Sequence, residues 1–222
     1  MTRRAFLESA AALAVTAAVF GGLEVAPWSL IGDAHAQGPA KAPTAEELLA
    51  PGPLPDQVLG DAKAPVTIIE YASMTCSHCA AFHTTTYPQM KQRYVDTGKV
   101  RYILREFPLD PLAAGAFMLA RCAGEGKYYP LVETLFKEQK NWAFVQNPIP
   151  PLFAIAKQAG FNEQTFEKCL SDQKLLDSVE AVRKQGAEKF GVTSTPTFFI
   201  NGKVVRGAMT ADELDKQLQP YL

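Results

Sequence analysis

The sequence predicts an α/β domain that is interrupted by an all-helical insertion of about 80 residues. Three observations lead to this fold class. Short β-branched runs at 65–71 and 100–107 flank a helical segment. Residues 112–190 show almost continuous helical spacing of apolar positions. Strand and turn signals return at 197–206, and a closing helix follows them.

The first half of the domain has the order strand, helix, strand. The run at 65–71 is mostly apolar, as expected for a parallel strand that is buried on both faces. A helix is expected from Cys76 to about residue 87. Pro88 can begin a second helical piece, which Gly98 ends. The run at 100–107 is the second strand.

The insertion is expected to contain five helices, which Gly, Pro and Asn residues separate. Their ranges are Leu112–Cys122, Tyr129–Gln139, Pro151–Ala159, Glu163–Leu170 and Leu175–Phe190. Asn201-Gly202 then predicts a hairpin between strands 197–201 and 203–206. Thr210 and Glu213 predict a capping box at the start of the last helix.

Composition and charge exclude several classes of protein. The 222 residues are 47% hydrophobic, which is enough for one sizeable core and excludes a disordered or collagen-like chain. Lys+Arg is 22 and Asp+Glu is 23, so the net charge of −1 argues against a nucleic-acid partner held by bulk electrostatics. Four cysteines are too few for a disulfide-dense mini-protein.

The first 36 residues have the pattern of a secretory signal. Arg3 and Arg4 precede an apolar run, and Ala34-His35-Ala36 has the small-x-small form of a cleavage site. A membrane anchor is the alternative, but the uncharged stretch 9–23 is shorter than the roughly 20 residues that a span needs. The Arg-Arg-x-Phe-Leu order resembles a twin-arginine signal, and general secretion is the other route. We therefore expect export and cleavage after about Ala36.

Residues 37–60 are expected to form a linker that precedes the folded domain at 61–222. The segment is Pro-rich, with prolines at 39, 43, 51, 53 and 55. Thr44 and Glu47 predict a capping box, and therefore a short helix to Ala50 within the linker.

A Cys-x-x-Cys pair, Cys76 and Cys79, lies at the start of the helix that follows the first strand. Unpaired amides at a helix N-terminus favour a thiolate, so Cys76 is expected to be the attacking sulfur. Cys79 lies on the same face and can resolve a mixed disulfide. His78 can donate a hydrogen bond or a positive charge to Cys76, which would make the disulfide more oxidising. The pair therefore predicts thiol–disulfide exchange.

Two other interpretations of the pair are a zinc half-site and a static disulfide. A zinc site needs a second ligand pair, and Cys122 and Cys169 lack the paired spacing, although His78 and His83 could supply ligands. We expect no metal and no cofactor. His83, one turn beyond Cys79, is expected to be a surface or cap residue.

Glu70 and Thr195-Pro196 are further candidates for the redox site. Glu70 lies six residues before Cys76 between apolar neighbours; if it is buried beneath Cys79, it can take the Cys79 proton. The alternative is an exposed glutamate at the strand end. A cis bond before Pro196 would place the Thr195 backbone beside the cysteines, where it could pair with a substrate strand. Residue type alone favours a trans bond.

Cys122 and Cys169 are expected to form a second disulfide, because an exported protein with an even number of cysteines usually pairs them. The bond would tie the first insertion helix to a later one and would stabilise the fold by roughly 4 kcal/mol on the chain-entropy model. Two buried free thiols are the alternative.

The chain resembles the thioredoxin superfamily, and within it the DsbA-like periplasmic disulfide oxidoreductases. The resemblance covers nearly all of 56–222, insertion included. The matching residues are Glu70-Tyr71-x-Ser73-x-x-Cys76-Ser77-His78-Cys79, Arg105-Glu106-Phe107-Pro108-Leu109 and Gly191-Val192-x-Ser194-Thr195-Pro196-Thr197-Phe198. The resemblance implies a thioredoxin fold with a helical insertion at about 110–190. It also implies Cys76 as nucleophile, Cys79 as resolving thiol and a cis bond before Pro196.

The resemblance further implies an enzyme of the periplasm that introduces disulfides into reduced or misfolded exported proteins, with a membrane redox partner that reoxidises it. Two positions depart from the archetypal oxidase: Ser77 stands in place of Pro between the cysteines, and Thr195 stands in place of Val before the cis proline. Thr195 is similar to the isomerase and reductase branches, so these directions remain alternatives. Outside the enzymes, the alternatives are a substrate-binding or holdase module and a periplasmic metal-binding protein. A monomer is expected.

Overall fold

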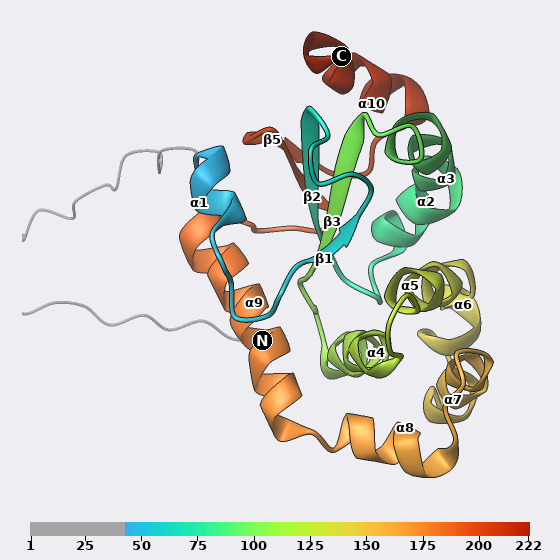
Figure 1. Ribbon diagram of the computed structural model, residues 1–222. Helices are drawn as coiled ribbons and strands as arrows, with labels where there is room; N and C mark the ends of the chain where they lie inside the picture. Colours follow the sequence, from blue (N-terminus) through green and yellow to red (C-terminus); the bar gives the residue numbers. More distant parts are fainter. Residues whose placement is uncertain (1–42) are drawn as a thin grey trace, which may run out of the picture. The chain divides into compact units, whose positions relative to one another are not determined.

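The computed structural model describes residues 43–222. The expected signal at 1–36, its cleavage site and the beginning of the expected linker lie outside the described residues. Within 43–222 the strands form one sheet of five, in the order β1-β3-β2-β4-β5. Helices cover both faces of this sheet, and a group of helices extends from one end of it (Figure 1).

The sheet is built around the two strands that the β-branched runs predicted. Its strands are β1 (Gln57–Leu59), β2 (Val66–Ala72), β3 (Val100–Glu106), β4 (Thr197–Ile200) and β5 (Lys203–Arg206). β2 and β3 are parallel, and the other neighbouring pairs are antiparallel. In β2 every residue but Thr67 is buried, which explains why its sequence is almost continuously apolar.

The connection from β2 to β3 is helical, as predicted. It consists of α2 (Ser77–Thr85), α3 (Tyr87–Met90) and a π-helical turn at Lys91–Val95. The chain closes with α10 (Ala211–Leu218) and a short 3-10 turn at Gln219–Tyr221. The capping box of Thr210 and Glu213 is present at the start of α10 and confirms that prediction.

Between β3 and β4 the chain contains only helices from Pro111 to Phe190. They are α4 (Pro111–Cys122), α5 (Tyr128–Lys137), α6 (Gln139–Trp142), α7 (Ile149–Gln158), α8 (Glu163–Leu170) and α9 (Gln173–Phe190). The expected helix at 129–139 ends early: it breaks at Glu138 into α5 and α6. No helix in the described part of the chain is long and apolar enough to cross a lipid bilayer.

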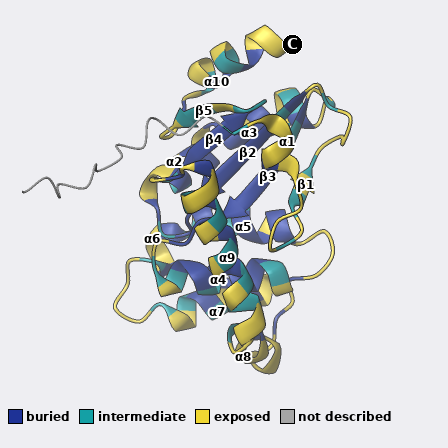
Figure 2. Ribbon diagram, turned by 90° about the vertical axis from the view of Figure 1, so that its left-hand side faces the viewer, coloured by how far each residue is buried: buried dark blue, intermediate teal, exposed yellow. Residues whose placement is uncertain are grey.

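The core has one layer on each face of the sheet. Neighbouring residues of β2 point to opposite faces, so Ile68 packs in the cluster with α2 and α3, and Ile69 packs in the cluster with α1 and α9. Figure 2 shows the buried strands between helices whose outer faces are exposed. Gly186 of α9 lies directly over Tyr71, and a Cβ at this glycine would stand 2.7 Å from the Tyr71 ring. Only glycine lets α9 approach the sheet this closely.

The expected linker at 37–60 needs a correction, because its described part belongs to the folded domain. Helix α1 (Ala45–Leu49) forms with the predicted capping box of Thr44 and Glu47, and its Leu48 is only 1% exposed. Arg105 of β3 donates to the Leu48 carbonyl at 2.6 Å and to both carboxylate oxygens of Asp56. Strand β1 then pairs with the edge of β3. Three residues of strand are too short to leave a periodic signal in the sequence.

Candidate redox site

Cys76 stands at the N-terminal cap of α2, in the place where Ser, Thr or Asp usually accepts an amide hydrogen bond. Its sulfur accepts from the backbone N–H of Cys79 at 3.4 Å. Both cysteines are free thiols in this structure. Cys76 is 8% exposed and Cys79 is 0% exposed, so only the first sulfur is accessible to another protein.

The surroundings of Cys76 stabilise its thiolate. The pKa of the Cys76 thiol is lowered to about 5, chiefly by a hydrogen bond from the Cys79 thiol and also by the backbone N–H groups of Cys79 and His78. Burial acts in the opposite direction but is outweighed. Cys76 is therefore mainly a thiolate at neutral pH, which is the form that attacks disulfides.

Cys79 is held in the opposite state. Burial is the main cause that raises its pKa well above the ordinary value, and the hydrogen bond to Cys76 and the charge of Glu70 act in the same direction. The thiol of Cys79 therefore keeps its proton at neutral pH. Cys76 is therefore the nucleophile of the pair, and Cys79 is the partner that holds its proton until it reacts.

Glu70 is buried in the sheet directly behind this helix, with 0% exposure, which excludes the exposed position that was its alternative. The Tyr102 hydroxyl donates a short hydrogen bond to Glu70 Oε2. His83 Nε2 lies 3.2 Å from the same oxygen. The structure thus brings Glu70 to the inner side of α2, the helix that carries both cysteines.

His83 was expected to be a surface or cap residue, and this expectation was wrong. It is only 5% exposed, and its ring is stacked between Tyr87 and Phe136, with centroids 4.8 Å and 4.2 Å away. Helix α5 packs beside α2 on the same face of the sheet, since the Tyr129 hydroxyl of α5 accepts from the Leu104 N–H of β3. His83 therefore lies where α2, α5 and the sheet meet. Position 83 follows the buried Cys79 by four residues and therefore lies on the same face of the helix. This spacing could have indicated the burial of His83 from the sequence.

Gln139 is a second residue that sequence reasoning missed. Its side-chain amide donates to the carbonyl oxygens of Met74 and Cys76, at 2.8 Å and 3.0 Å. It thereby holds the loop that carries Cys76 from β2 into α2. Gln139 opens the four-residue helix α6, more than sixty residues away in the chain, and no local pattern indicates this contact.

Thr195 lies on the other side of the Cys76 sulfur, where the candidate substrate contact was expected. The bond between Thr195 and Pro196 is cis. The Thr195 carbonyl oxygen lies 3.3 Å from the Cys76 sulfur and accepts its hydrogen bond when Cys76 is protonated. Pro196 is buried, whereas Thr195 is partly exposed and Ser194 is exposed, so this loop reaches the surface beside Cys76.

The side chain of His78 is exposed, and within 43–222 no hydrogen bond joins it to Cys76. Its backbone N–H is the part of this residue that acts on the Cys76 thiolate. Among the described residues, no group of three or more His, Cys, Asp or Glu side chains is arranged to hold a metal ion.

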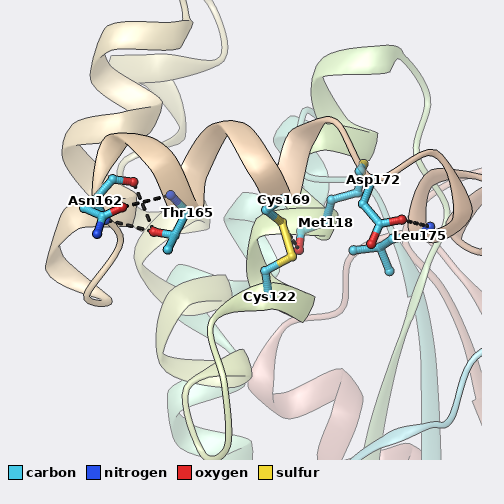
Figure 3. The surroundings of a disulfide bond; sticks show 7 residues. All are labelled: Met118, Cys122, Asn162, Thr165, Cys169, Asp172 and Leu175. Carbon is cyan, nitrogen blue, oxygen red and sulfur yellow. Dashed lines mark hydrogen bonds between the residues drawn. A yellow bond between two sulfur atoms is a disulfide. The ribbon is translucent and has the colours of Figure 1, made fainter.

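Cys122 and Cys169 are joined by a disulfide that links α4 to α8, with their Cα atoms 6.2 Å apart (Figure 3). Asn162 and Thr165 form a capping box at the start of α8, and Asp172 caps the following α9. The bond lies within the insertion and does not contact the Cys76 pair. It therefore belongs to the framework of the insertion and not to the exchange site.

A thiolate and a protonated thiol on one helical turn, facing a cis proline, define a DsbA-like protein of the thioredoxin class. The chain belongs to the thioredoxin family, since the family model described as Thioredoxin matches residues 54–220.

Known relatives and structures agree with this class. The chain is 34% identical over 148 residues to a Rickettsia bellii protein whose name assigns it provisionally to the protein-disulfide oxidoreductases. That match covers 66% of this chain and only 57% of the relative. A similar match to a Rickettsia felis protein, at 32% identity, covers 75% of this chain and 60% of that protein. The crystal structure of Wolbachia pipientis alpha-DsbA1 is similar with a TM-score of 0.74 and 33% identity, over 80% of this chain and 96% of that one.

Proposed function

We propose that the protein is an enzyme, a DsbA-like thiol:disulfide oxidoreductase that introduces disulfides into exported proteins through Cys76 and Cys79. One observation carries this proposal: the same turn of helix holds an accessible sulfur whose pKa is lowered to about 5 and a buried sulfur whose pKa is raised. A stabilised Cys76 thiolate favours the reduced pair, and a protein that favours its reduced form gives its disulfide away.

The reaction begins with the oxidised Cys76–Cys79 pair. A substrate thiolate attacks Cys76 Sγ, the bond between the two cysteines breaks, and Cys79 leaves and takes a proton. A second substrate thiolate then attacks the substrate sulfur in the mixed disulfide, and Cys76 leaves as a stabilised thiolate. The two electrons end on the Cys76–Cys79 pair, and the substrate carries the new disulfide.

Glu70 is the proposed proton donor and acceptor for Cys79. It is the buried acid behind α2, and its charge contributes to the raised pKa of the Cys79 thiol. A carboxylate in this position can receive the proton when Cys79 attacks and return it when Cys79 leaves.

The substrate backbone is proposed to lie along Thr195. The Thr195 carbonyl already faces Cys76 Sγ, so an extended segment that pairs with this loop would bring its own sulfur to the Cys76 sulfur. Such recognition uses main-chain groups and accepts many sequences. It suits reduced or misfolded exported proteins as substrates and a membrane redox partner that binds the same loop to reoxidise the pair. Export to the periplasm, by the expected signal at 1–36, is part of the same proposal.

A disulfide isomerase or reductase is the second candidate, and Thr195 before the cis proline favours it. The same site would then work from the reduced pair, with the Cys76 thiolate attacking a substrate disulfide.

Trapping experiments test the proposed exchange. Oxidation of a reduced protein substrate should be lost in Cys76→Ser, because Cys79 is fully buried and Cys122 and Cys169 are held in a disulfide away from Thr195. Cys79→Ser should accumulate a mixed disulfide with substrate at Cys76, detectable by mass spectrometry. Full activity of Cys76→Ser would reject the enzyme and favour a binding or holdase role for the same surface.

A further inference from the structure

We propose that His83 is a positioning residue for the proton step at Cys79: with Tyr102 it anchors one oxygen of Glu70 and leaves the other oxygen free for the proton. This inference rests on the proposed function of the Cys76–Cys79 pair and deepens it.

Two groups from different elements converge on the same carboxylate oxygen. Tyr102 of β3 donates to Glu70 Oε2, and His83 of α2 places its Nε2 3.2 Å from that oxygen. Glu70 Oε1 is buried and has no hydrogen-bond partner among the residues that the structure describes. Oε1 therefore has lone pairs that no hydrogen bond uses, and it is the oxygen of Glu70 that is able to accept a proton.

The surroundings of His83 determine which of its nitrogens carries the proton. Nδ1 is buried and has no partner in the described structure. If the proton were on Nδ1 alone, an unpaired N–H donor would be buried and the Nε2 lone pair would face a carboxylate oxygen. Both effects would raise the free energy of the folded protein. Of the two neutral tautomers, the one with its proton on Nε2 therefore fits the site, and its N–H donates a hydrogen bond to Glu70 Oε2.

The other titratable groups that face this cluster stay neutral. They are Tyr102 of β3, Tyr87 of α3 and Tyr129 of α5, and in each of them burial is the main cause that raises the pKa of the hydroxyl. The Tyr87 hydroxyl donates a hydrogen bond to Glu133 Oε1 of α5, at 3.2 Å. Within 43–222, His83 is the one basic side chain that pairs with Glu70.

Cys79 lies one helical turn before His83 on the same inner face of α2, within the electrostatic reach of Glu70. When a mixed disulfide at Cys76 is resolved, the Cys79 proton passes to Glu70 Oε1. The Cys79 thiolate then attacks Cys76 Sγ, the bond from Cys76 to the substrate sulfur breaks, and the substrate leaves as a thiolate with the electron pair. In the opposite direction Cys79 leaves as a thiolate and takes the proton back from Oε1. His83 keeps its proton on Nε2 throughout.

His83→Phe is the sharpest variant, because it keeps an aromatic ring between Tyr87 and Phe136 and removes only the donor. The protein is loaded with thionitrobenzoate as a mixed disulfide at Cys76, and release of the coloured thiol reports the attack by Cys79. The rate is measured from about pH 4 to pH 9 for the wild type, His83→Phe, Tyr102→Phe and Glu70→Gln. Tyr87→Phe is the matched control, because it loses a buried hydroxyl of the same cluster that does not bind Glu70.

We expect His83→Phe and Tyr102→Phe each to slow release by about tenfold and to change the pH profile, with a larger loss in Glu70→Gln. Tyr87→Phe should keep the wild-type rate and profile. The double variant Glu70→Gln/His83→Phe should be no slower than Glu70→Gln alone, because His83 acts through Glu70.

The rates of the variants distinguish a failure of the His83 role from a failure of the proposed enzyme. A wild-type rate and profile in His83→Phe, with Glu70→Gln slow, overturns the role of His83 and leaves the proposed enzyme intact. Wild-type behaviour in Glu70→Gln overturns both proton roles. If His83→Phe does not fold, nitrogen NMR of His83 in the wild type decides: a proton on Nε2 supports the inference, and a proton on Nδ1 alone overturns it.

Discussion

The sulfur of Cys76 and the carbonyl oxygen of Thr195 lie 3.3 Å apart, although 119 positions separate the two residues in the chain. The first ends the loop after β2, and the second precedes β4, the antiparallel neighbour of β2. The sheet therefore places the Cys76 nucleophile beside the backbone of Thr195, an arrangement that neither segment could form alone.

The stability of the reduced protein should fall in acid. The Cys76 pKa is lowered from 9.0 to about 5 in the folded state, so its thiolate contributes stability above pH 9 that is lost as the pH falls to about 5. The oxidised protein has no such thiolate. Chemical denaturation of both forms across this range should therefore show their stability difference shrinking toward acid pH. A constant difference would contradict a lowered Cys76 pKa.

Gln139→Ala should destabilise the protein by about 2 kcal/mol, because the buried Met74 carbonyl loses its side-chain donor and the Cys76 carbonyl keeps only the N–H of Ala80. The loss should appear as a lower denaturation midpoint. Gln146→Ala is the matched control, since Gln146 is exposed in the loop after α6, and it should leave the midpoint unchanged. Equal effects of the two substitutions would show that the Gln139 contacts do not hold the loop.

Replacing Cys122 and Cys169 by Ser should lower the free energy of unfolding by roughly 4 kcal/mol, less any strain in the native bond. The bond closes a loop of 47 positions between α4 and α8, so its removal frees much of the insertion in the unfolded chain. Non-reducing mass spectrometry of the exported protein should find the bond. Free thiols at both positions, or unchanged stability of the variant, would argue against this role.

Gly186→Ala should destabilise the protein by about 1–3 kcal/mol, because the new methyl would stand 2.7 Å from the buried Tyr71 ring. Gly115→Ala makes the same change in α4 but meets only Leu170 Cδ2 at 3.4 Å. Helix propensity then favours alanine, so this control should be neutral or stabilising. Thermal unfolding of the two variants measures the contrast. If both behave alike, α9 does not depend on a glycine to approach the sheet.

Local patterns predicted most of the elements that carry the site. The β-branched runs gave β2 and β3, helical spacing gave the insertion, and the Cys-x-x-Cys motif located the pair. The cis bond at Pro196 came from resemblance and not from residue type. The strands, helices and cysteine pair are encoded within a few neighbouring residues, whereas the cis bond is not.

The contacts between distant segments could not be predicted in this way. His83 was predicted to be a surface residue because its burial depends on α5, which packs beside α2 on the same face of the sheet. Gln139 reaches the Cys76 loop from a four-residue helix, and β1 exists only because the edge of β3 pairs with it. Packing decides all three. Only His83 had a local signal, its four-residue spacing from Cys79, and no neighbouring pattern indicates Gln139 or β1.

The equilibrium of the Cys76–Cys79 pair with glutathione redox buffers tests the central claim most directly. It is measured on protein with Cys122 and Cys169 replaced by Ser, with the intact protein as control. A stabilised Cys76 thiolate predicts an oxidising potential, and a value of about −120 mV, that of a known disulfide donor, would support the proposed direction. A potential of about −250 mV would place the pair among reductants and contradict the proposed direction of transfer.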